Sequence, residues 1–198
     1  MIALIDYGAG NLTSVKKALA AIGADVRVPG EPADLGDALG VIVPGVGHFG
    51  ATARLQGDWT EAILARVGEG RPLLGICLGM QWLYESSDEA PDVRGLGLIS
   101  GACYRLPADT VKVPHVGWNT LRVERPVSIL EGVESDSQVY FTHSYVAPAT
   151  NDTAATTEHG ARFAAVVQRG YVAGVQFHPE KSGDVGLQVL RNFLAMVG

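Results

Sequence analysis

Strand-like and helix-like segments alternate along the first 80 residues, and this alternation restricts the fold more than any other feature. Short apolar runs predict buried strands at Ile2–Ile5, Ala24–Val28, Val41–Val43 and Pro72–Ile76. Between them, apolar residues recur at helical spacing in residues 11–22 and 55–67. Strands that alternate with helices are typical of parallel strands joined by right-handed helical crossovers. This order therefore predicts an α/β fold: a mainly parallel central sheet flanked by helices.

The second half of the chain has a different pattern. Between Leu96 and Val175 the sequence consists of short β-rich runs separated by turn residues. These runs, for example 111–113, 139–145 and 163–168, predict antiparallel strands added to the parallel sheet. A further strand is predicted at 171–177, leading into His178. A last helix is expected after Ser182 as its cap, with one apolar face formed by Leu187, Leu190, Leu194 and Val197. Since no linker or repeat divides the chain, we expect one domain over residues 1–198.

Charge and apolar patterning argue against several partners. The chain carries 15 basic and 21 acidic residues, a net charge of −6, with no basic run. This balance argues against nucleic acid and against an anionic membrane surface. No apolar run approaches the roughly 20 residues that span a bilayer, and the first residues lack a signal-peptide pattern. We therefore expect a cytoplasmic protein.

The segment from Gly75 to Gln81 contains a cysteine in the pattern Gly-Ile-Cys-Leu-Gly. A buried strand precedes Cys77 and a helical pattern follows it, so the cysteine is expected at a sharp strand-to-helix turn. Glycines on both sides remove side chains that would collide there. The following helix start favours a thiolate, the nucleophilic form of cysteine. The alternative is a buried core thiol, which is our expectation for Cys103.

The second chemical segment is His178-Pro179-Glu180, at the end of a predicted strand. In an extended segment, residues two apart point the same way, so His178 and Glu180 are expected on one face. A carboxylate beside an imidazole fixes its tautomer and stabilises its cation. Because Cys77 also follows a strand, the sulfur and the imidazole are predicted to meet at one sheet edge. The alternative is three unrelated residues.

A third segment, Pro44-Gly45-Val46-Gly47, follows the predicted strand at 41–43. Its glycines let backbone N–H groups turn toward a ligand, or let a peptide plane take two orientations. With the N–H of Leu78, the residue after the nucleophile, it predicts an oxyanion hole. The alternative is an ordinary turn.

No cofactor is expected. The histidines at 48, 115, 143 and 159 lack the spacing of a metal site, so we interpret them as structural. Gly8-Ala9-Gly10 lacks the third glycine of a dinucleotide-binding loop.

Taken together, these motifs resemble the class I, triad-type glutamine amidotransferases. The class is indicated by residues 75–81 and by Gly174-Val175-Gln176-Phe177-His178-Pro179-Glu180. The branch of glutaminase subunits of imidazole glycerol phosphate synthase is indicated by further segments, at 6–12, 44–47, 114–119, 143–145 and 181–182. The resemblance extends from the first strand to the last helix.

The resemblance implies a mechanism and its residues. Cys77, His178 and Glu180 would form a catalytic triad that hydrolyses glutamine to glutamate and ammonia through a thioester. The oxyanion hole would comprise Val46, Gly47 and Leu78. The implied contacts to the glutamine substrate are Gly47, Gln81, Ser144 and Tyr145.

The resemblance also implies a partner, a (β/α)₈-barrel cyclase subunit that forms a heterodimer with the glutaminase. Ammonia would pass to that subunit for histidine biosynthesis, sheltered from protonation. The implied interface residues are Asn11, Trp118, Tyr140 and Lys181. For Trp118 and Tyr140 the alternative is core packing, and for Lys181 a solvated charge.

Three other functions stay open at this point. One is a triad glutaminase serving anthranilate, aminodeoxychorismate or guanylate synthesis, which segments 44–47 and 114–119 fit less well. A second is a γ-glutamyl peptide hydrolase, which secretion and disulfides would favour. A third is a non-enzymatic subunit on the same scaffold, which an intact triad argues against.

Overall fold

A central sheet of eight strands organises the protein. The computed structural model describes residues 1–10 and 12–198. The strand order is β2-β1-β3-β4-β13-β12-β11-β8. The first five of these strands run parallel to one another, and β12, β11 and β8 continue the sheet in antiparallel fashion. The predicted parallel sheet with added antiparallel strands is therefore confirmed.

The strands of this sheet are short and mostly buried. In sheet order their bounds are β2 (Val26–Arg27), β1 (Ile2–Leu4), β3 (Gly40–Val43), β4 (Leu73–Ile76), β13 (Val172–Val175), β12 (Arg162–Arg169), β11 (Thr153–Glu158) and β8 (Arg122–Val123). Two smaller sheets lie beside it, one of β10 (Tyr145–Val146), β6 (Ala102–Arg105) and β5 (Ser86–Ser87), and one of β7 (His115–Thr120) and β9 (Gln138–His143).

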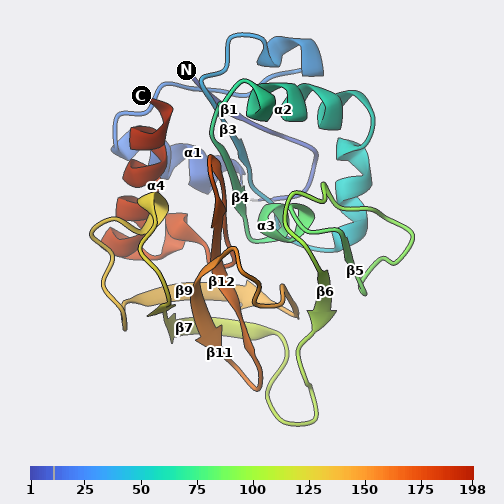
Figure 1. Ribbon diagram of the computed structural model, residues 1–198, viewed down its shortest axis with the longest axis vertical. Helices are drawn as coiled ribbons and strands as arrows, with labels where there is room; N and C mark the ends of the chain where they lie inside the picture. Colours follow the sequence, from blue (N-terminus) through green and yellow to red (C-terminus); the bar gives the residue numbers. More distant parts are fainter. Residues whose placement is uncertain (11) are drawn as a thin grey trace.

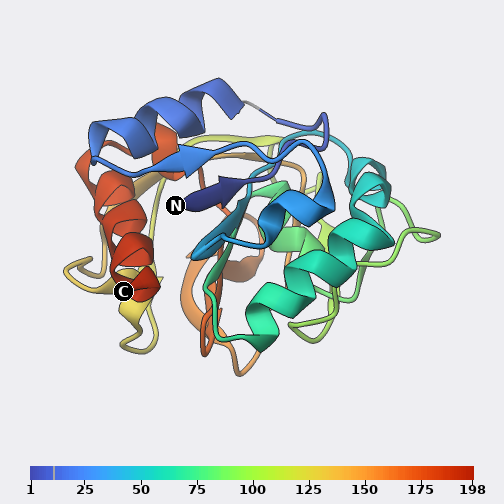
Figure 2. The ribbon, with the colours of Figure 1, turned by 90° about the horizontal axis from the view of Figure 1, so that it is seen from above.

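Helices cover both faces of the parallel part (Figures 1 and 2). Their bounds are α1 (Leu12–Ala21), α2 (Asp58–Gly68), α3 (Leu78–Trp82) and α4 (Gly183–Val197). Leu4 of β1 packs in one apolar core with Leu19 of α1 and Phe193 of α4. Its neighbour Ala3 points to the other core, with Ile63 of α2 and Met80 of α3. This alternation of side chains along a strand buries both faces of the sheet.

Short 3-10 helices occupy several connections. They are η1 (Pro32–Leu35), η2 (Phe49–Leu55), η3 (Ser128–Leu130) and η4 (Pro179–Lys181). Of these, η4 bears directly on the site, because it begins immediately after His178.

Three local predictions were wrong. Residues 111–113 form no strand; pairing begins at His115, in β7. Residues 178–180 are not extended, because Pro179 starts η4. Ser182 is the residue before α4 but makes no capping bond there. Its hydroxyl donates to the carbonyl of His178 (2.7 Å) and accepts the N–H of Tyr140 (2.9 Å).

The buried face of α4 is rotated from the predicted one. Leu190 is buried as expected, but Leu187, Leu194 and Val197 are only partly buried. The other buried positions are Gly186, Val189, Asn192 and Phe193. A strictly leucine-based pattern misses this face because glycine and asparagine occupy part of it. None of the helices in the described part of the chain has the length and apolar character needed to span a membrane.

Candidate active site

The nucleophile and its base follow two neighbouring strands. Cys77 directly follows β4, and His178 lies three residues beyond β13. The two strands are paired in parallel, with Ile76 opposite Val175, and the N–H of Cys77 donates to the carbonyl of Val175 (2.8 Å). Sheet pairing therefore brings together two segments about 100 residues apart, at the strand ends where open α/β sheets place their sites.

Cys77 sits in a strained turn. Its φ is +53°, in the left-handed region that residues with a β-carbon rarely adopt. A β-carbon at Gly75 would lie 2.5 Å from the carbonyl oxygen of Gly79, and one at Gly79 would lie 1.8 Å from that of Val43. The two glycines are thus required by close backbone approach, as the sequence predicts for a nucleophile elbow.

His178 and Glu180 form a buried pair. His178 Nδ1 lies 2.8 Å from Glu180 Oε1, and both side chains are 2% exposed. Since a carboxylate only accepts, Nδ1 carries a proton and Nε2 is the nitrogen that faces the chemistry. Nε2 has no hydrogen-bond partner among the described residues. The turn of η4, rather than an extended segment, brings the two side chains together.

The charges around His178 favour its protonated form. Burial acts to lower the pKa of the imidazole, but its interactions with Cys77 and then with Glu180 outweigh burial and raise the pKa to about 10. The imidazolium of His178 is therefore the charge partner that a cysteine nucleophile requires when it attacks a carbonyl carbon.

A second donor reaches the sulfur. Gln176 Nε2 lies 3.6 Å from Cys77 Sγ, and Gln176 is fully buried. Its amide is oriented by Gln81, whose Nε2 donates to Gln176 Oε1 (3.0 Å) and to the carbonyl of Tyr145 (2.8 Å). Because both Gln81 amide hydrogens are used, the Gln176 oxygen faces Gln81 and its NH₂ group faces the sulfur. Sequence reasoning gave Gln176 no role, although it stands two residues before His178.

A cavity of about 310 Å³ opens beside the sulfur. All four residues predicted to contact substrate line it, and they are Gly47, Gln81, Ser144 and Tyr145. Cys77 and Leu78 line it as well. The structure thus brings these predicted residues together, while His178 and Glu180 lie outside the lining.

Sequence reasoning gave no site role to four residues that line this cavity, which are Glu89, Pro114, Thr142 and His143. Glu89 lines it and accepts the N–H of Phe49 at Oε2 (2.6 Å). His143, expected to be merely structural, lines it too; its Nδ1 lies 3.1 Å from the carbonyl of Tyr145, and its Nε2 lies 3.1 Å from His115 Nδ1. Burial and then the neighbouring His115 lower the pKa of His143 to about 3, so its ring is neutral. Pairing of β7 with β9 creates this contact, which no local pattern signals.

The predicted oxyanion donors are not all available in this conformation. The N–H of Leu78 donates to the carbonyl of Gly45 (3.2 Å). An oxyanion would need that N–H, so the Gly45 carbonyl oxygen occupies the acceptor position that the oxyanion would take. Val46 is half-buried and Gly47 is exposed, with φ of +102° at Gly47.

Three predicted interface residues cluster on the surface. The rings of Trp118 and Tyr140 meet edge to face, with centroids 6.1 Å apart, and Lys181 Nζ lies 5.6 Å from the Tyr140 ring centroid. Trp118 is 56% exposed, which excludes core packing as the reason for this residue. The backbone carbonyl of Tyr140 also accepts the N–H of His178 (2.9 Å), so this cluster is bonded to the triad segment. Asn11, the fourth predicted interface residue, lies outside the described residues.

The remaining cysteine and histidines fit structural roles. Cys103 is fully buried, with Sγ 3.8 Å from the carbonyl of Gln81. His48 accepts the N–H of Gly50 at the start of η2 (3.0 Å). Within residues 1–10 and 12–198, no cluster of three or more metal-ligating side chains occurs.

Comparison with known proteins decides the family. The family model described as glutamine amidotransferase class-I matches residues 3–197. This chain belongs to the class-I glutamine amidotransferases. As an amidotransferase of this class it is an enzyme, and the mixed α/β sheet is the fold of its structural neighbours.

Relatives similar over their whole length narrow the branch. The "Imidazole glycerol phosphate synthase subunit HisH" of Moorella thermoacetica is 49% identical, covering 99% of this chain and 95% of that protein. The protein of the same name from Methanothermobacter thermautotrophicus is 47% identical, covering 100% and 99%. Among solved structures, one described as a glutamine amidotransferase superposes with a TM-score of 0.79 at 22% identity, covering all of both chains. PurLQS from Thermotoga maritima gives 0.80 at 18%, covering 100% and 98%.

Proposed function

We propose that this amidotransferase is the glutaminase subunit of an imidazole glycerol phosphate synthase. It hydrolyses glutamine to glutamate and ammonia and delivers the ammonia to a cyclase subunit in histidine biosynthesis. Two findings support the assignment: the names of relatives that match the entire chain, and the set of side chains around one sulfur. The observation that carries the chemistry is the pairing of β4 with β13, which puts Cys77 beside His178.

The reaction begins with attack of the Cys77 thiolate on the side-chain amide carbon of glutamine. The amide oxygen becomes an oxyanion, which N–H groups of Leu78 and of Val46 or Gly47 stabilise. His178, protonated at Nε2, gives its proton to the departing nitrogen, so the C–N bond breaks and ammonia leaves. A γ-glutamyl thioester remains on the sulfur.

Water completes the cycle. Nε2 of His178, now unprotonated, takes a proton from water as the oxygen attacks the thioester carbon. The C–S bond breaks, glutamate forms and the thiolate returns. Glu180 holds Nδ1 and stabilises the imidazolium in both halves, and the Gln176 N–H groups stabilise the thiolate each time it is regenerated.

The cavity composition supports an amino-acid substrate. Ser144, Tyr145 and Gln81 supply polar groups around a space of about 310 Å³. The carboxylate of Glu89 suits the α-ammonium group of glutamine, because an opposite charge at a half-buried site gives both attraction and orientation. We assign Glu89 to this contact in addition to the four residues predicted from sequence.

We assign the cyclase contact to Trp118, Tyr140 and Lys181, with Asn11 as a fourth position predicted from sequence. An exposed tryptophan beside a tyrosine and a cation is the residue chemistry of binding hot spots. The hydrogen bond from the His178 N–H to Tyr140 supplies a path by which a partner at this surface acts on the triad. A second element of control is the Gly45 carbonyl, which blocks the Leu78 N–H until the peptide turns.

Glutamate release tests the assignment. The chain is assayed with glutamine alone, with a barrel cyclase added, and with the cyclase plus its nucleotide substrate. We expect glutamate formation that depends on both additions. Cys77→Ser abolishes it, whereas the matched Cys103→Ser variant retains it. Equal turnover in Cys77→Ser and in the wild type contradicts the triad; a rate independent of cyclase and nucleotide contradicts the specific branch.

A further inference from the structure

Tyr7 carries an unused hydroxyl beside the oxyanion loop. The residue follows β1, the strand next to β3, and is 6% exposed. Its hydroxyl oxygen is buried and has no hydrogen-bond partner in the described part of the chain. Burial first, and the charge of Cys77 second, raise the pKa of Tyr7 above its ordinary value, so the group stays protonated and keeps its donor hydrogen. A buried hydroxyl without a partner is destabilising and calls for a reason.

The loop residue that Tyr7 touches is Gly45. A β-carbon at Gly45 would lie 2.1 Å from the Tyr7 hydroxyl oxygen, so the phenol group rests against the α-carbon of Gly45. Further along the same segment, a β-carbon at Gly10 would lie 3.3 Å from the Gly45 α-carbon and 3.6 Å from the Val46 nitrogen. Residues on both sides of the Gly45–Val46 peptide are therefore in contact with the segment that carries Tyr7.

In the proposed mechanism, the peptide plane between Gly45 and Val46 must rotate before the oxyanion can bind. The Gly45 carbonyl now accepts the Leu78 N–H. In a trans peptide the C=O and N–H groups point in opposite directions. Rotation of the Gly45–Val46 plane therefore frees the Leu78 N–H and brings the Val46 N–H to the side that the carbonyl leaves. One motion provides both predicted oxyanion donors, but it takes the Leu78 N–H away from the Gly45 carbonyl.

We propose that Tyr7 is the positioning residue of the active oxyanion loop: its hydroxyl donates to the Gly45 carbonyl once the peptide has turned. The resting conformation leaves the Tyr7 hydroxyl without an acceptor, and the turned conformation leaves the Gly45 carbonyl without a donor. A hydrogen bond between the Tyr7 hydroxyl and the Gly45 carbonyl gives each group a partner, and it forms only in the turned conformation. The bond therefore stabilises the conformation that binds the oxyanion. The inference rests on the proposed function, because it concerns the same oxyanion.

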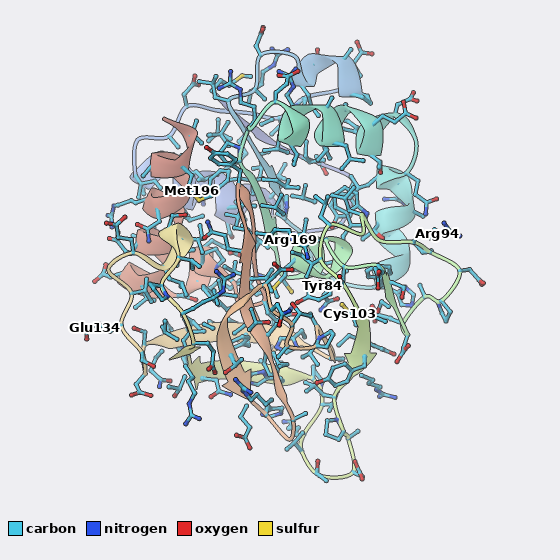
Figure 3. The ribbon with its side chains drawn as sticks, viewed as in Figure 1. Tyr84, Arg94, Cys103, Glu134, Arg169 and Met196 are labelled. Atoms are coloured by element: carbon cyan, nitrogen blue, oxygen red, sulfur yellow. The ribbon has the colours of Figure 1, made fainter. Side chains whose placement is uncertain are left out.

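The test compares two tyrosines that differ in one respect. Tyr7→Phe removes a hydroxyl without a partner in the resting state. Tyr84→Phe removes the hydroxyl of another buried tyrosine, which donates to the carbonyl of Pro148 (3.2 Å). Tyr84 belongs to the same apolar core as Tyr7 but lies beside Cys103 (Figure 3). The ligand is glutamate γ-semialdehyde, whose aldehyde carbon takes up the Cys77 thiolate; its oxygen gains the negative charge, and no group leaves.

For Tyr7→Phe we expect binding of the aldehyde to weaken about tenfold and cyclase-stimulated kcat to fall by a similar factor, with little change in KM. Its Tm should equal or exceed that of the wild type. For Tyr84→Phe we expect wild-type aldehyde binding and a lowered Tm. These opposite patterns distinguish loop positioning from general packing.

Two outcomes overturn this inference without contradicting the proposed function. The first is that Tyr7→Phe binds the aldehyde as tightly as an active wild type does. The second is that Tyr7→Phe loses as much Tm as Tyr84→Phe. The second would mean that the hydroxyl already has a resting partner. A wild type that neither hydrolyses glutamine nor binds the aldehyde contradicts the proposed function, and the inference then fails with it.

Discussion

Gln176 Nε2 lies 3.6 Å from Cys77 Sγ, with its amide orientation fixed by Gln81 on the other side. The nucleophile therefore has two sources of stabilisation, an imidazolium and a neutral amide donor. The helix that follows the cysteine, α3, has only five residues, so its N-terminal field is a smaller contribution than the sequence suggests.

Replacing this donor should slow the thiolate chemistry. The variant Gln176→Met keeps the length of the side chain and loses both N–H groups. We measure alkylation of Cys77 by iodoacetamide and take the ratio of the rate at pH 6.5 to the rate at pH 9. This ratio should be roughly tenfold lower in the variant than in the wild type, because a hydrogen bond to a charged group contributes about 1.5–3 kcal/mol. The matched control is Gln168→Met. That glutamine is also buried but bonds to Ser128 and Gly170, so its loss should reduce stability and leave the alkylation ratio unchanged. An unchanged ratio in Gln176→Met would refute the role.

Removing the charge of Glu180 should impair turnover without changing substrate binding. Glu180→Gln retains the shape of the side chain but stabilises the His178 imidazolium less. We expect kcat for glutamine to fall by about 100-fold, in the range typical of general acid–base groups, with KM nearly constant. Steady-state kinetics at saturating cyclase measures both. Wild-type kcat in this variant would show that the 2.8 Å contact has no catalytic part.

The buried histidine pair should make stability depend on pH. Burial, and in each case a neighbouring histidine, lower the pKa of His143 to about 3 and of His115 to about 4. The unfolded chain, with ordinary histidines, binds more protons below pH 6.5, so the folded state loses stability as pH falls from 6.5 toward 4. His178, with its raised pKa, stays protonated in the folded state but is about half protonated in the unfolded chain at pH 6.5, so it opposes this slope near pH 6.5 and adds little at lower pH.

Denaturant unfolding at pH 6.5 and 5.0 checks this effect. Each histidine contributes at most about 1.4 kcal/mol per pH unit. The variant His143→Gln should show a shallower dependence than the wild type over the same interval. A wild-type unfolding free energy that is flat between these two pH values would contradict neutral, buried rings.

The nucleophile turn should tolerate no side chain at Gly79. A β-carbon there would overlap the Val43 carbonyl at 1.8 Å, so Gly79→Ala should lower the unfolding free energy by roughly 3 kcal/mol or more, a magnitude reached by strain at a special backbone position. The control is Gly68→Ala at the end of α2, where a β-carbon meets nothing within 4 Å; it should stabilise by about 0.5–1 kcal/mol. Equal thermal midpoints for the two variants would contradict the tight elbow.

Features with a local cause could be predicted from sequence. The parallel strands and the glycine-flanked turn at Cys77 follow from residue types and spacing. The pocket position of Ser144 and Tyr145 is implied only by the family resemblance. The geometry of residues 178–180 could not, because Pro179 is compatible both with an extended segment and with the first residue of a 3-10 helix.

Contacts between distant segments account for the rest. His143 depends on the pairing of β7 with β9, and Glu89 depends on a bond to Phe49, 40 residues away. The orientation of the Gly45 carbonyl is set by a choice between two peptide orientations that glycine permits equally. Such choices are decided by tertiary packing, on which a single sequence gives no direct information.

The central claim is that Cys77 is the nucleophile of a glutamine site, and covalent labelling measures this directly. The protein, with cyclase and nucleotide present, is treated with 6-diazo-5-oxonorleucine, an electrophilic glutamine analogue, and digested for mass spectrometry. We predict one adduct per chain, on Cys77, that excess glutamine prevents, with Cys103 unmodified. An adduct on Cys103, or labelling of Cys77 that glutamine does not slow, would contradict the account.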